Sequence, residues 1–79
     1  MPVFLVERYV AESETAALTD RIRRAAKGGD VTWLASVVLP GEDACLCLFE
    51  ASSAAAVVAL NRRAGADLDR VVEAALVRS

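Results

Sequence analysis

The stretch that decides the fold is Val31-Thr-Trp-Leu-Ala-Ser-Val-Val-Leu39, followed by Pro40-Gly41-Glu42-Asp43 and Ala44-Cys-Leu-Cys-Leu-Phe-Glu50. The first and last of these segments are rich in β-branched, aromatic and other apolar residues, which favour strands. The middle segment combines a proline, which presets φ, with a glycine, which allows a positive φ, so it is typical of a tight turn. We therefore expect a hairpin of two strands, 31–39 and 44–50.

A strand and a helix are predicted before this hairpin. Residues 2–10 are rich in β-branched and aromatic types and contain no breaker, so they predict a first strand. Ser13 is a good N-cap for a helix over residues 14–27. The helix has apolar residues at helical spacing on one face, and Gly28-Gly29 is expected to end it.

A second helix and a last strand are predicted after the hairpin. Ser52 or Ser53 is expected to cap a helix that continues to about Ala64, and Gly65 stands where a left-handed C-cap residue is expected. Residues 69–77 then predict a fourth strand. The resulting order of elements is β-α-β-β-α-β.

This order in 79 residues predicts a single α+β domain, residues 1–79, of the ferredoxin-like kind. We expect a four-stranded antiparallel sheet with both helices on one face. Within it, the first and third strands are expected in the middle and parallel to each other.

Both faces of the predicted sheet are apolar. Alternation places Val3 and Leu5 on one side of the first strand and Phe4 and Val6 on the other. The same rule in the second strand places Trp33 with Val37 and Leu39, opposite Leu34 and Val38. Two helices cover only one face, and monomers rarely expose large apolar patches, so we expect a homodimer that pairs the open faces.

Charge and hydropathy limit the partners. The formal net charge of −2 provides no basic field for phosphates, so neither nucleic acid nor an anionic membrane surface is expected as a partner. The apolar runs are far shorter than a membrane span, and the N-terminal run has no basic segment before it, which does not fit a secretory signal. We expect a cytoplasmic protein.

The chain contains no histidine, which removes the commonest general base and the commonest transition-metal ligand. Neither a phosphate-binding loop nor a dinucleotide-binding fingerprint is present. We therefore expect no cofactor and no metal, and catalysis is not favoured.

Two cysteines, Cys45 and Cys47, fall on the same side of one predicted strand. Their spacing is at the upper edge for a disulfide, and we interpret them as small apolar residues of the core. The alternative is half of a four-thiolate site, completed by the dimer mate and suited to a soft metal.

Glu7, Tyr9 and Trp33 are the candidate ligand-binding residues. Glu7 and Tyr9 share a face with Val3 and Leu5, which we expect to be open because the helices should cover Phe4 and Val6. There a carboxylate and a phenol could bind a small molecule between two sheets, and Trp33 could stack on a flat ligand. The alternatives for Glu7 are a strand end that reaches solvent or a charge paired with an arginine (Arg8, Arg62 or Arg70). The alternative for Trp33 is burial in the sheet-to-sheet contact.

Five short motifs, read in order, resemble a small bacterial domain-of-unknown-function family that includes nickel-binding ferredoxin-like proteins. They are Phe4-Leu-Val-Glu7-Arg8, Val31-Thr-Trp33, Cys47-Leu-Phe, Arg62-Arg63-Ala-Gly65 and Asp69-Arg70-Val71. The resemblance implies a homodimer whose two sheets face each other, with metal or a small ligand bound in the space between them.

At two positions this chain departs from the family pattern. Ala35, and either Leu60 or Asn61, stand where the family usually has histidines. Nickel prefers nitrogen ligands to isolated carboxylates, so we expect a homodimeric binding or scaffold protein without the histidine metal ligands. The alternative is a dimeric αβ-barrel enzyme resembling cofactor-free monooxygenases.

Overall fold

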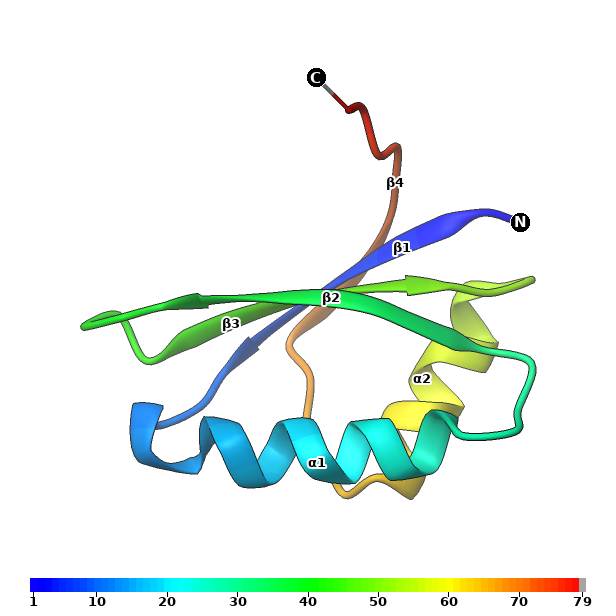
Figure 1. Ribbon diagram of the computed structural model, residues 1–79. Coiled ribbons are helices and arrows are strands. Elements are labelled where there is room, and N and C mark those ends of the chain that lie inside the picture. Colours follow the sequence, from blue (N-terminus) through cyan, green and yellow to red (C-terminus); the bar gives the residue numbers. More distant parts are fainter. Residues whose placement is uncertain (79) are drawn as a thin grey trace.

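The computed structural model describes residues 1–78 and has the β-α-β-β-α-β order of the ferredoxin-like plan. Both helices pack on one face of the sheet and the opposite face is bare, which we call the open face (Figure 1). The elements are β1 Val3–Tyr9, a 3-10 turn Glu12–Glu14, α1 Thr15–Ala26, β2 Thr32–Leu39, β3 Ala44–Glu50, α2 Ala54–Arg63 and β4 Arg70–Ala74.

The four strands form one antiparallel sheet in the order β2-β3-β1-β4. The expected central position of β1 and β3 is confirmed, but the expectation that they run parallel is wrong, because they pair antiparallel. The reason is the connection through α1. It carries the chain back so that β2 runs in the same direction as β1, and the hairpin then reverses β3 between them.

The core lies between the sheet and the helices. Its buried side chains come from alternate positions of the central strands and from one face of each helix. They include Phe4, Val6, Phe49, Leu18, Ile22, Val57 and Leu60. The predicted assignment of Phe4 and Val6 to the helix side is therefore confirmed, and Val3, Leu5, Glu7 and Tyr9 fall on the open face.

The helix ends follow the sequence signals unevenly. Ser53 caps α2 by accepting a 3.2 Å hydrogen bond from the Ala56 amide, and Gly65 has the positive φ of +67° expected after the helix. Ser13 does not cap α1. It lies within the 3-10 turn, and the N-cap position is taken by Glu14, whose side chain accepts no capping hydrogen bond.

Strand β2 contains a bulge that the sequence pattern did not reveal. Trp33 pairs with Phe49 and Ala35 pairs with Leu48, so the residue between them, Leu34, has no partner on β3. The bulge moves Trp33 to the helix side, while Val37 stays on the open face opposite Leu46. The last strand also ends earlier than expected, at Ala74 instead of residue 77.

Candidate functional site

The open face carries a charged row next to an apolar one. Across the sheet, Leu5 lies between Leu48 of β3 and Val72 of β4, which makes an apolar row. Two residues along β1, Glu7 lies between Leu46 and Arg70. A carboxylate and a guanidinium are thus placed beside each other next to an apolar row, and a second carboxylate, Glu50, lies on the same face opposite Val3.

Glu7 is joined to Arg70 by a long ion pair. The Arg70 Nη2 and Glu7 Oε2 atoms are 3.9 Å apart, and the two side chains are 63% and 33% exposed respectively. The predicted pairing of Glu7 with an arginine therefore involves Arg70. At this distance and exposure the pair contributes little to stability, so a polar ligand group could compete for either member.

Tyr9 lies two residues beyond Glu7, on the same face of β1, and is 66% exposed. Its backbone amide donates a 3.1 Å hydrogen bond to Asp69 Oδ2, which holds the strand end near the start of β4. The structure therefore brings Glu7 and Tyr9 together on the open face, as the sequence predicted.

Trp33 does not join them, and the prediction that it lies on the face of Val37 and Leu39 is wrong. The bulge places it on the helix side, packed against the core. The guanidinium carbon of Arg23 on α1 lies 5.2 Å from the centre of its ring, in a cation–π arrangement. Together with Arg23 and Thr32, Trp33 borders a surface hollow of about 530 Å³ beside α1.

The two buried thiols end a partly buried polar chain on the helix side of the sheet. Trp33 Nε1 donates to Ser36 Oγ at 3.0 Å, and Ser36 Oγ donates to Cys47 Sγ at 2.9 Å. Cys47 Sγ in turn lies 3.8 Å from Cys45 Sγ, and both cysteines are free. Their interpretation as buried core residues is confirmed.

Burial suppresses the reactivity of the Cys45 thiol. Desolvation, followed by the neighbouring Cys47 sulfur, raises the pKa of Cys45 from 9.0 to about 11. At neutral pH Cys45 is therefore a protonated thiol, which is neither a nucleophile nor a ready metal ligand. Within residues 1–78, no group of three or more histidine, cysteine, aspartate or glutamate side chains is placed to hold a metal ion.

A second polar feature, which the sequence reasoning missed, is the pair Arg8–Asn61. Arg8 Nη2 donates a 2.6 Å hydrogen bond to Asn61 Oδ1, and both residues are fully buried. A signal for it was present, because Arg8 continues the alternation of Phe4 and Val6 toward the helices. An arginine in a helix-facing position must find acceptors inside the core.

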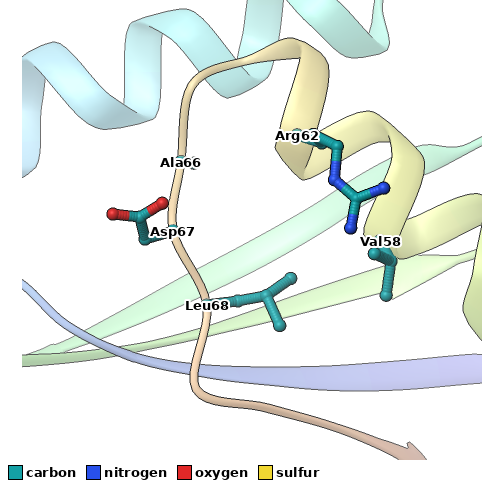
Figure 2. Close-up of a pocket in the computed structure, with 5 residues that line it drawn as sticks. All are labelled: Val58, Arg62, Ala66, Asp67 and Leu68. Atoms are coloured by element: carbon teal, nitrogen blue, oxygen red, sulfur yellow. The ribbon is translucent and has the colours of Figure 1, made fainter.

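The segment after α2 also borders a small hollow of about 210 Å³, lined by Val58, Arg62, Ala66, Asp67 and Leu68. Figure 2 shows Arg62, Val58 and Leu68 on one side of this segment and the Asp67 carboxylate pointing to the other side. Arg62 therefore borders the hollow without a carboxylate opposite it, and none of the predicted ligand-binding residues lies here.

No helix of the described residues has the length and apolar character that crossing a membrane requires.

The chain was compared with known proteins. Residues 4–74 match the family model described as "Nickel responsive protein SCO4226-like". The crystal structure of SCO4226 from Streptomyces coelicolor A3(2) superposes with a TM-score of 0.81, at 21% sequence identity, over 96% of this chain and 99% of that one. No curated protein matches the sequence.

Proposed function

The chain belongs to the nickel-responsive SCO4226-like family, and from that premise we propose that it is a homodimeric small-ligand-binding protein. Two copies pair their open faces about a two-fold axis, and the ligand occupies the space between the sheets. Glu7, Tyr9 and Arg70 provide its polar contacts.

The observation that carries the proposal is the apolar character of the open face. Val37 and Leu39, large aliphatic residues in the second half of β2, are 51% and 38% exposed. Val37 lies beside Leu46, and the next row along the sheet is the half-buried row of Leu5, Leu48 and Val72. A continuous aliphatic surface of this kind is unfavourable in water, and a second copy would cover it with an identical surface.

The charged row supports a ligand site within such a dimer. Closing the faces would remove water from Glu7 and Arg70, whose present contact of 3.9 Å is too long to replace that hydration fully. A small molecule with both donor and acceptor groups would restore the missing hydrogen bonds. This favours a polar organic ligand held among aliphatic side chains.

Nickel is not part of the proposal, although the family is described as nickel-responsive. The chain has no histidine, and the cysteines are buried on the other side of the sheet. A metal between the open faces would have only carboxylates such as Glu7 from each copy, which is a poor ligand set for nickel.

Light scattering on the purified protein tests the dimer. We expect the mass of two chains at micromolar concentration. Leu48→Lys, which places a charge in the middle of the open face, should give the mass of one folded chain. Val77→Lys makes the same change of charge at a valine beyond β4 and should stay dimeric. A wild-type protein that is monomeric throughout would refute the proposal.

A further inference from the structure

Arg8 is a charged side chain enclosed almost completely by the protein. It is 1% exposed and follows Phe4 and Val6 on the helix side of β1. Its Nη2 donates to Asn61 Oδ1 at 2.6 Å and its Nη1 donates to the backbone oxygen of Asp67 at 3.1 Å. Both of these acceptors are neutral groups.

Among residues 1–78, the charge of Arg8 has no counter-ion. The ion pairs of residues 1–78 are Arg23–Asp20 and Arg70–Glu7, and neither includes it. Arg8 Nε is in addition buried without a hydrogen-bond partner. A guanidinium stays charged in proteins, and a buried charge without a charged partner is strongly unfavourable. The site therefore lacks one anionic acceptor.

A pocket of about 290 Å³ adjoins this guanidinium. Arg8 forms part of its wall, together with Leu18 and Arg21 of α1 and Gly65 and Asp67 after α2. Arg21 is held in place by a 2.9 Å hydrogen bond from its Nε to the backbone oxygen of Ala64. Two positioned guanidinium groups, one of them buried, thus border the same pocket.

Two carboxylates limit which anion fits. Glu14 and Asp67 also line the pocket, both residues are exposed, and neither forms an ion pair with Arg8 or Arg21. They offset the two positive charges, so the pocket disfavours a multiply charged anion such as phosphate. A planar group with a single charge matches both the charge and the shape of a guanidinium edge.

We propose that this pocket binds a small carboxylate through Arg8, with Arg21 as the second cationic contact. The site lies on the helix side of the sheet. Tyr9, at the end of β1, borders this pocket as well as the open face, but Glu7 and Arg70 do not line it. The two proposals rest on different charged groups, so either can fail without the other.

Nuclear magnetic resonance on the ¹⁵N-labelled wild-type protein tests the proposal without disturbing the core. Sodium acetate is titrated at constant ionic strength while the Nε–H signals of the arginines are followed. We expect the Arg8 signal to shift and saturate, because an anion bound beside the guanidinium changes the surroundings of its Nε–H. Acetamide, the neutral molecule of the same shape, should leave it in place.

Three variants keep the proposal falsifiable through the affinity for acetate. Arg21→Gln should weaken binding by about tenfold, the size of one lost charged contact. Lys27→Gln removes the same charge just after α1, outside the pocket, and should leave binding unchanged. Asp67→Asn should strengthen it severalfold because a repelling carboxylate is lost.

Three results would overturn the proposal. One is an Arg8 signal that responds equally to acetate, acetamide and sodium chloride. Another is an equal loss of affinity in Arg21→Gln and Lys27→Gln. The third is tighter binding of phosphate than of acetate, which would exclude the carboxylate class.

Discussion

Arg8 on β1 and Asn61 on α2 are joined inside the core by a hydrogen bond of 2.6 Å, although 53 residues separate them in the sequence. The amide of Asn61 is oriented by its own donation to the backbone oxygen of Val57 at 2.8 Å, which turns its oxygen toward Arg8. One side chain therefore positions the acceptor for the only arginine that is buried among residues 1–78.

Replacing Asn61 by leucine should destabilise the protein strongly, because Arg8 would keep its charge and lose its side-chain acceptor. We expect the free energy of unfolding to fall by about 2–4 kcal/mol in urea denaturation. The double variant Asn61→Leu with Arg8→Met should lose less than the sum of the two single variants, since no charge is left unpaired. Additive losses would show that the two side chains are not coupled.

Replacing Glu7 by glutamine should change the free energy of unfolding by less than about 1 kcal/mol, because its partner Arg70 is largely exposed and 3.9 Å away. Thermal melts at pH 7 measure this, with Glu73→Gln on the neighbouring strand as the matched control. If the free energy of unfolding fell by about 1–3 kcal/mol in Glu7→Gln but not in Glu73→Gln, Glu7 would be a structural member of an ion pair. Its role in ligand binding would then be abandoned.

The Cys45 thiol should make stability fall in alkaline solution. Its pKa is raised to about 11 in the folded protein from an ordinary value of 9.0, so the unfolded chain releases the proton first. The contribution of the Cys45 thiol to the free energy of unfolding is intact below about pH 9 and is lost as the pH rises toward 11. The free energy of unfolding should fall by at most about 1.4 kcal/mol per pH unit over this range. Urea denaturation should show a flatter dependence over this range in Cys45→Ala. An equal pH dependence of the free energy of unfolding in the wild type and in Cys45→Ala would contradict the raised pKa of Cys45.

The fluorescence of Trp33 should change when the protein unfolds but not when the proposed dimer dissociates. Its ring lies on the helix side, below Arg23, so opening the sheet-to-sheet contact would leave its surroundings unchanged. We expect the Leu48→Lys variant to have the fluorescence maximum of the wild type, and urea to shift both to longer wavelength. A shift in the folded variant alone would place Trp33 at the interface after all.

Nickel and zinc should bind weakly or not at all, because the chain has no imidazole and its thiols are buried. Titration calorimetry with each metal is the direct measurement. A submicromolar site that disappears in Cys45→Ser or Cys47→Ser would contradict this expectation and would restore the shared thiolate site.

The sequence predicted the elements well where local signals and hydrophobic alternation agree. The turn at Pro40-Gly41, the cap at Ser53 and the two sides of β1 were all predictable, because each depends on a few neighbouring residues. The direction of β1 relative to β3 was predicted wrongly. It depends on how a distant crossover returns the chain, which no local pattern records.

The candidate site was predictable only in part, for a similar reason. Glu7 and Tyr9 follow regular alternation, and their face could be inferred from their apolar neighbours. Trp33 could not be placed, because one unpaired residue in β2 reverses the side of everything before it. Arg8 follows the same alternation toward the helices, but its acceptors could not be inferred from neighbouring residues because they come from α2 and the segment after it.

The bulge at Leu34 also matters when related sequences are compared, because one residue without a partner on β3 changes which side of the sheet the preceding residues face. In a related chain without Leu34 but otherwise identical, Trp33 would remain on the helix side if the strand were regular at this point. An alignment that omitted this gap would assign the residues of β2 before the bulge to the wrong side of the sheet. An insertion or deletion at this point can therefore move aromatic side chains from one side of the sheet to the other without any substitution. When site residues of a relative are assigned to this strand, they should be matched by their pairing partners on β3 and not by their position in a sequence alignment.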